Sequence, residues 1–476
     1  MSILPRRAHI MALSVCGVFL GSSARLCLAQ ENSPQAIQSM TLPEAFAYAR
    51  EHHPQIKSAL ATAMARKAEA RIPRAEWLPQ IGGTAQIFYG SVNTTTAEYL
   101  SVPEADLPRV GSTRGTGSTD WTPQASTIAG VSLGQEVFDF GRIAAQISVA
   151  DAFSEMARAD AASIDLDVQL GVEEAYHSVL AAKEVLHATE EAYKRATTHR
   201  DFAQAGVKSG MRPPIDLTRA QADVAMLGVR LIRATSGVGV AQAALAAAVG
   251  SQAMTIDAQP ISLDESPAPA FDEAIRTAAR ANPAIAASIA RLRAQVFSSK
   301  EIIRELLPNI SASAGLNGRA GGATPSTTGP GTLPYGDGWL PDVANWHLGL
   351  VLQWNIFDGT VLARRAASKA HEQALQADLE LERMSVTFGA EHAWLDLDTA
   401  LKSLQGLVQS VDAAKANQQQ ADARFRAGLG TIIELADAEA VLTTAELELA
   451  IGQFSVARAR ATLGRIMGQP LMRKGT

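Results

Sequence analysis

The stretch Gly428-Leu429-Gly430-Thr431-Ile432-Ile433-Glu434-Leu435-Ala436-Asp437 separates two helical segments of the chain. Its glycines end one predicted helix, and the acidic turn that follows them begins another. Beyond it, an apolar residue recurs at every seventh position, and a small residue recurs between: Leu435, Leu442, Leu449, Val456 and Leu463 alternate with Ala438, Ala445, Gly452 and Ala459. This heptad pattern with small residues at one position predicts a long helix packed closely on its neighbours.

The same heptads occur 218 residues earlier, at Leu217, Val224, Leu231, Val238 and Leu245, with Ala220, Leu227, Ala234 and Ala241 between them. Other segments also return: Leu78-Pro79-Gln80-Ile81 becomes Leu307-Pro308-Asn309-Ile310, and Phe138-Asp139 becomes Phe357-Asp358. Self-similarity at a nearly fixed period indicates a duplication. We therefore divide the chain into two repeated halves, 41–250 and 270–468, joined by a Pro-rich linker over 251–269.

Composition favours helices and argues against binding of nucleic acid. Apolar residues make up 47% of the 476 residues and aromatic residues only 5%. An alanine-rich sequence with few bulky aromatics suits long, closely packed helices. The formal net charge is -6, and the sequence has no run of Lys and Arg.

The N-terminus has the pattern of a secretory signal peptide over 1–29. Arg6 and Arg7 precede an apolar stretch that is too short to span a bilayer, and cleavage is expected after Ala29. The arginine pair leaves general secretory and twin-arginine export open. Cys16 and Cys27 lie in this segment, so no disulfide is expected in the mature chain. No later run of 18 apolar residues is present, so we expect no transmembrane helix, and a membrane crossing would require a barrel.

Four segments alternate apolar and polar residues and are predicted strands, at about 78–90, 127–138, 308–318 and 345–357. In the last, Trp346, Leu348, Leu350, Leu352 and Trp354 alternate with His347, Gly349 and Gln353. Their length and alternation are typical of outer-membrane barrel strands, and Trp346 and Trp354 suit an interfacial girdle. The alternative is a soluble four-stranded sheet with one dry face.

Long helices are predicted at about 142–207, 215–249, 360–426 and 432–466. The first has no proline and would be on the order of 100 Å long, a length suited to bridging the periplasm. The loops at about 91–125 and 318–344 are rich in Gly, Ser, Thr and Pro, as expected of exposed external loops.

With these parts in order, nearly the whole mature chain resembles the TolC-type outer-membrane efflux proteins. The matching motifs are Glu44-Ala45 to Pro54, Trp77-Leu78-Pro79, Phe138-Asp139-Phe140-Gly141-Arg142, and Arg424-Phe425-Arg426-Ala427-Gly428 leading to Ile433-Glu434-Leu435.

The resemblance implies a mainly α fold with a transmembrane β part, assembled as a homotrimer. Three chains would form a 12-stranded β-barrel in outer-membrane lipid, continuous with a periplasmic α-helical barrel. It also implies a passive exit duct of a tripartite efflux or type I secretion system, in which a periplasmic adaptor and an inner-membrane pump are the partners. The alternative is a periplasmic coiled-coil adaptor or scaffold without a pore.

No enzymatic motif is present in the sequence, which has no P-loop, nucleophile elbow or HExxH. We therefore expect no catalytic residues, no cofactor and no metal site. The isolated histidines, His52, His53, His371 and His392, are interpreted as structural.

The resemblance places Glu434 and Asp437 at the narrowed periplasmic entrance. They are three residues apart and share a helix face, so a trimer would carry a ring of six carboxylates that attracts cations. The alternative is that both acids only complement the helix dipole and face water.

Arg212 and Asp216 lie at the first-half turn, and Asp216 corresponds to Glu434. Family members carry a basic residue two positions after the second-half glycine that holds the entrance shut through ionic links, but here that position is Gly430. We hypothesise that Arg212 takes its place and pairs with Asp216, Glu434 or Asp437.

The same two turns are the expected docking surface for adaptor hairpins, through Gly210, Met211, Gly428, Leu429, Gly430 and Ile432. The alternative is that these residues only pack the turns.

Overall fold

The computed structural model describes residues 38–90, 121, 124–251, 255–321 and 344–469. The expected signal peptide and its cleavage site lie outside these residues, as does most of both expected external loops.

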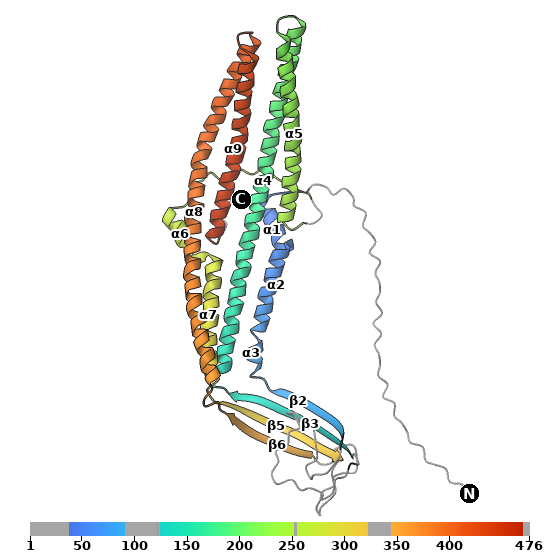
Figure 1. The fold of residues 1–476 in the computed structure, drawn as a ribbon, viewed down its shortest axis with the longest axis vertical. Coiled ribbons are helices and arrows are strands. Elements are labelled where there is room, and N and C mark those ends of the chain that lie inside the picture. The colour runs from blue at the N-terminus through green and yellow to red at the C-terminus, as the bar shows by residue number, and fades with distance from the viewer. Residues whose placement is uncertain (1–37, 91–120, 122–123, 252–254, 322–343, 470–476) are drawn as a thin grey trace, which may run out of the picture. The chain divides into compact units, whose positions relative to one another are not determined.

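Two long helical hairpins form most of the described chain (Figure 1). In the first half α4 (Arg142–Lys208) is followed by α5 (Pro214–Ala248), and in the second half α8 (Gly359–Arg426) is followed by α9 (Ile432–Ile466). The helices of each hairpin pack along each other, and α4 also packs against α9. The chain is therefore mostly helical, with one hairpin from each half.

Shorter helices precede each hairpin, and two of them are capped in similar ways. They are α1 (Leu42–His52), α2 (Pro54–Glu69) and α3 (Ile72–Ala75) in the first half, and α6 (Phe271–Ala281) and α7 (Pro283–Arg304) in the second. α2 and α7 both begin with proline, and the side chains of His53 and Asn282 accept hydrogen bonds from their first turns. α7 packs between α4 and α8 and thereby joins the two halves.

The four long strands form one antiparallel sheet in the order β2-β3-β5-β6. They are β2 (Gln80–Gly90), β3 (Gln124–Phe138), β5 (Asn309–Gly321) and β6 (Ala344–Gln353). β3 pairs with β5, so a single sheet contains one strand pair from each half. The helical turns between α4 and α5 and between α8 and α9 lie at the far end of the helices from this sheet (Figure 1).

The cross-strand register places large apolar side chains on one face of the sheet, and small or polar side chains on the other. One row runs through the pairs Ile81–Leu133, Leu133–Ala314 and Ala314–Leu348, and the next row pairs Ser132 with Gly315. The large apolar side chains of the first face are exposed: Ile81, Ile87, Val131, Leu133, Leu316, Trp346, Leu348, Leu350 and Leu352. Period-two alternation thus produces an uncovered apolar surface on one side of the sheet.

The last strand is shorter than the 345–357 expected from the sequence, because it ends at Gln353. Beyond it the indole of Trp354 donates a hydrogen bond to the carbonyl of Leu306, 3.1 Å away. Asp358 then caps α8 by accepting from Thr360 N. The apolar–polar alternation of the sequence continues beyond the last strand pairing at Gln353. The strand ends there because the chain leaves the sheet to enter α8.

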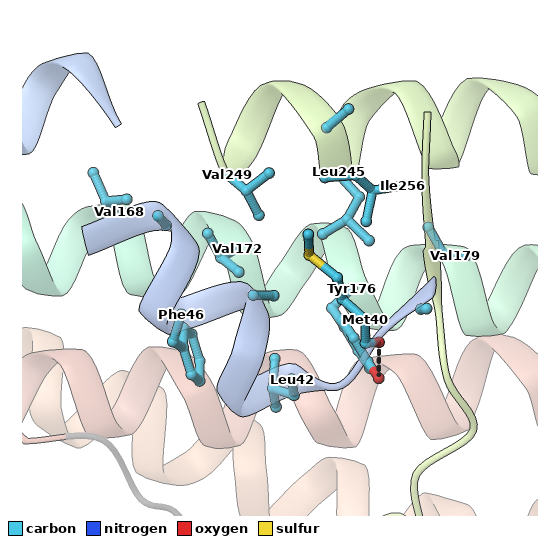
Figure 2. Close-up of a cluster of buried hydrophobic side chains, with 14 of the residues drawn as sticks. Met40, Leu42, Phe46, Val168, Val172, Tyr176, Val179, Leu245, Val249 and Ile256 are labelled. Carbon is cyan, nitrogen blue, oxygen red and sulfur yellow. Dashed lines mark hydrogen bonds between the residues drawn. The ribbon is translucent and has the colours of Figure 1, made fainter. Parts of the chain in front are cut away.

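A small parallel pair, β1 (Gln38–Met40) and β4 (Ile256–Ala258), lies against α4 and α5 (Figure 2). The buried Tyr176 of α4 donates its hydroxyl hydrogen to the carbonyls of Gln259 and Met40, at 2.7 and 3.2 Å. Lys183 of α4 forms an ion pair with Asp257 at 2.7 Å. These contacts attach the start of the first half and the linker to the same turns of α4.

One described helix bears on the expectation of no membrane-spanning helix. Among the described helices, α5 is long and apolar enough to cross a bilayer by length and composition. Alanine, glycine and valine fill much of its second half. The mean hydropathy of this helix is therefore high, although the helix contains no continuous run of 18 apolar residues. α5 packs lengthwise on α4 and buries Ala220, Ala241 and Leu245.

Candidate functional site

The two hairpin turns have the same backbone. Gly210 and Gly428 adopt left-handed conformations, with φ of +73° and +75°. Each glycine ends its helix, and the next residue donates back to the preceding turn, Met211 N to Gly206 O and Leu429 N to Arg424 O, both at 2.9 Å. A side chain is strained at this φ, which explains why both halves have glycine here. We call the segments 209–216 and 427–437 the first and second tips.

The carboxylates of Glu434 and Asp437 are exposed in the first turns of α9. Thr431 caps this helix by accepting from Glu434 N at 3.2 Å. Arg424 approaches Glu434 at 4.0 Å, but both side chains are exposed and such a pair contributes little. Asp437 has no ion pair within the described residues. Both acids therefore face solvent at the second tip.

Arg212 belongs to the first tip and is partly buried, with its side chain 14% exposed. Of the three acids predicted as partners, it contacts Asp216, at 3.5 Å. Its Nη2 also donates to the carbonyl of Phe425 at 2.8 Å, and its Cζ lies 3.8 Å from the centroid of that ring. The guanidinium therefore joins the first tip to the end of α8.

The residues predicted for adaptor docking differ in their exposure to solvent. Met211 and Leu429 are exposed at the ends of the tips, and Gly430 lies beside them. Ile432, however, is only 7% exposed, so its assignment to the docking surface is wrong. It packs in a cluster with Ala203, Ala220, Phe425 and Leu435.

The exposed neighbour is Ile433, which the sequence analysis did not include. Its counterpart in the first tip, Ile215, is exposed as well. The heptad contained the signal, because Ile432 precedes Leu435 by three residues and so shares its buried face.

The two predicted girdle tryptophans, Trp346 and Trp354, are both exposed. Trp346 lies in β6 opposite Leu316, and Trp354 follows the other end of the strand. The two indoles therefore stand near opposite ends of the last strand, with exposed leucines between them.

Sequence reasoning missed a charged cluster that connects α4 to α9 just inside the tips. We call it the tip clamp: Arg195, His199, Gln418, Asp422, Glu439 and Glu446. Glu439 lies at its centre and is within 2.7 Å of Arg195 Nε, 3.2 Å of His199 Nε2 and 2.7 Å of Gln418 Nε2. Asp422 and Glu446 lie farther out, 3.8 Å from His199 and 3.7 Å from Arg195.

The ionised form of Glu439 is favoured in this cluster. Burial acts to raise the pKa of its carboxyl, but hydrogen bonds from His199, Gln418 and Arg195 outweigh burial and lower the pKa below its ordinary value. The carboxylate thus holds side chains from both halves of the chain. Within the described residues, no three His, Cys, Asp or Glu side chains are grouped so that they could hold a metal ion.

A sheet with an exposed apolar face, two tandem helical hairpins and acidic tips define the chain as an outer-membrane channel protein with a helical extension. Both halves match the family model described as outer membrane efflux protein, over residues 47–251 and 274–469. The chain belongs to this family. It is an outer-membrane efflux channel protein of tripartite systems that extends into the periplasm, and its family is one of transport proteins.

The chain is 26% identical over 344 residues to the cobalt-zinc-cadmium resistance protein CzcC of Cupriavidus metallidurans, covering 69% of this chain and 74% of that one. Its fold is similar to that of the outer-membrane channel OprN, with a TM-score of 0.69, 21% identity and coverage of 90% and 89%. The CmeC outer membrane channel of Campylobacter jejuni gives a TM-score of 0.72 at 16% identity, with coverage of 98% and 94%. These two structures are similar to the chain in fold.

Proposed function

We propose that three copies of this chain assemble into one passive exit duct across the outer membrane. The outer edges of β2 and β6 are unpaired in the described chain, and a free sheet edge favours pairing with another strand. Three four-stranded sheets joined edge to edge would close a twelve-stranded barrel, wide enough to leave a lumen. The exposed apolar face would contact lipid, with Trp346 and Trp354 near its two borders.

The acidic tips would form the periplasmic entrance of this duct. Glu434 and Asp437 from three copies would place six carboxylates around one constriction, which attracts cations and repels anions. The exposed apolar residues beside them, Met211, Leu429 and Ile433, would receive the hairpins of a periplasmic adaptor. An inner-membrane pump would supply the energy, since the chain has no nucleotide-binding motif.

The observation that carries this proposal is the open sheet with one uncovered apolar face, in a chain whose hairpin tips lie at the other end of long helices. The test is isolation of the native protein from membranes, followed by recording in planar bilayers. We expect trimers that dissociate on heating in detergent, and stepwise ionic currents. A monomer released from the periplasm as a soluble protein would instead support the coiled-coil scaffold.

For the cargo, we propose divalent metal cations. The similarity to a protein of cobalt, zinc and cadmium resistance favours this class, and the acidic tips are compatible with it. Organic toxic molecules and a secreted polypeptide are the alternatives.

Growth of a strain lacking this gene distinguishes these cargos. We expect increased sensitivity to Co²⁺, Zn²⁺ or Cd²⁺, restored by the wild-type gene, and unchanged sensitivity to organic compounds. Sensitivity to organic compounds alone would reject metal cations as the cargo.

A further inference from the structure

A cavity of about 130 Å³ lies between α4, α5 and α9, just inside the two tips. One face of each helix lines it. Ala192, Ala196 and His199 of α4 follow one another at helical spacing, and Met226 of α5 and Ala440 of α9 lie on the facing walls. The cavity is therefore built from both halves of a single chain.

The floor of this cavity is apolar, and its mouth is open to solvent. Ala192, Ala220 and Leu435 are each no more than 3% exposed, whereas Met226 is 50% exposed. An apolar cavity of about 150 Å³ binds benzene, so the volume here suits a single aromatic ring or a short alkyl chain. The thioether of Met226 favours a ring, because sulfur packs well against ring edges.

One carboxylate at the cavity lacks a partner. Asp223 of α5 lines the cavity, and it makes no hydrogen bond or ion pair in the described part of the chain. Its side chain is half-buried, and burial raises the pKa of this carboxyl above its ordinary value. Because burying a carboxylate without a partner is unfavourable, a cation with N–H donors would stabilise it.

The internal repeat indicates that helix packing does not require this acid. At the offset of 218 residues, the counterpart of Asp223 is Val441, so the second hairpin has an apolar side chain at the same position. The pairing of helices that both hairpins share is thus compatible with valine. An apolar cavity with a few polar groups and a carboxyl of shifted pKa is typical of a site for a small molecule.

The other charged groups at the cavity leave Asp223 available. Glu439 lies 3.2 Å from His199, and it also accepts hydrogen bonds from Arg195 and Gln418. Arg230, which also lines the cavity, lies two helical turns from Asp223, and it is exposed. At that spacing, about 10 Å, solvent and salt screen much of its charge. The free charge at the cavity is therefore negative, which favours a cation.

We propose that this cavity binds a small organic ammonium ion, with the ammonium group on Asp223 and the aromatic or alkyl part on the apolar floor. Such a ligand would contact α4, α5 and α9 and hold the two hairpins of one chain together. The site is separate from Glu434 and Asp437, neither of which lines the cavity. The inference goes beyond the proposed duct and does not rest on it, because a single chain supplies every lining residue.

Benzylamine is the probe that tests this site, because it joins an aromatic ring to an amine that is protonated at neutral pH. Benzyl alcohol is the neutral probe of the same shape, and benzoate is the anionic one. Isothermal titration calorimetry of the full chain in a non-ionic detergent measures binding. We expect saturable binding of benzylamine, about tenfold or more tighter than that of benzyl alcohol, and no binding of benzoate.

Two variants locate the binding. Asp223→Asn keeps the size of the side chain and removes its charge, so it is expected to weaken benzylamine binding by about tenfold or more and to leave benzyl alcohol binding unchanged. Ala440→Leu adds bulk at an exposed position of the cavity wall and is expected to weaken binding of both probes. Asp412→Asn, which removes an exposed acid of α8 outside the cavity, is the matched control and is expected to change neither.

Three results would overturn the inference. They are an absence of saturable benzylamine binding to wild type, benzyl alcohol or benzoate binding as tightly as benzylamine, and equal benzylamine affinity for wild type and Asp223→Asn. Thermal unfolding of each variant without ligand checks that the fold is retained. Because Asp223 and Ala440 are not buried, both variants are expected to unfold close to the wild-type temperature.

Discussion

The guanidinium of Arg212 lies over the ring of Phe425, with Cζ 3.8 Å from the ring centroid, and donates to that residue's carbonyl at 2.8 Å. The two residues are in different halves of the chain, and each stands close to the glycine that ends a long helix. The same side chain contacts Asp216. One arginine therefore joins the first tip to the end of α8.

Replacement of Arg212 by alanine is expected to loosen the tips. It removes a cation–π contact and a charge-assisted hydrogen bond, and it leaves Asp216 without its partner. We expect mean bilayer current to rise by about tenfold, the factor that corresponds to about 1.4 kcal/mol. Arg424→Ala is the matched control, because Arg424 is exposed and its ion pair with Glu434, at 4.0 Å, contributes little. Equal currents for wild type and Arg212→Ala would reject the ionic link.

Neutralising the second tip is expected to reduce ion selectivity. Glu434→Gln with Asp437→Asn removes all six proposed carboxylates from the entrance without changing side-chain size. The ratio of cation to anion permeability, measured as the reversal potential in a salt gradient, should fall about twofold or more. Glu51→Gln, an exposed acid of α1, is the control. An unchanged reversal potential would mean that the two acids only complement the helix dipole.

The stability of the folded protein is expected to depend on pH through Glu173. Burial raises the pKa of this carboxyl to about 7, opposed by Arg460 and reinforced by Glu174. Because this value lies above the ordinary 4.5, the group contributes stability at low pH that is lost as pH rises through about 7. Glu173→Gln should therefore be more stable than wild type at pH 8, by about 2 kcal/mol, and the difference should shrink towards pH 5.

Thermal unfolding in detergent at both pH values measures this effect. Glu190→Gln is the control, since Glu190 is an exposed acid on the same helix, α4. A difference between Glu173→Gln and wild type that is the same at pH 5 and pH 8 would contradict the prediction.

Substitutions of two leucines in the second tip are expected to distinguish a role in folding stability from a role in adaptor docking. Leu435 is 2% exposed, so Leu435→Ala should cost about 2–5 kcal/mol of stability because it leaves a cavity. Leu429 is 76% exposed, so Leu429→Ala should change stability by about 0.5 kcal/mol or less but weaken binding to the purified adaptor. Thermal unfolding and an adaptor binding titration measure the two effects. Adaptor binding that is unaffected by Leu429→Ala would remove this residue from the docking surface.

The sequence alone determined the features that are set by local period. Heptads at an offset of 218 residues indicated the repeated hairpins, and the structure has helices that begin and end within one residue of the predicted positions. Alternation indicated the four strands, and the predicted boundary differs most from the structure at the end of the last strand, which leaves the sheet after Gln353. Such patterns are readable because a helix or strand repeats the same geometry at each turn or residue pair.

Tertiary structure decided the contacts between the halves. Nothing near Arg195 in the chain indicates that it meets Glu439, 244 residues away, or that Arg212 reaches Phe425 and not Glu434. The heptad places Ile432 on the same face as Leu435, but only the packing of α9 brings that face against Ala203 and Phe425. A periodic sequence fixes which residues share a face, whereas the packing of one helix on another fixes what that face contacts.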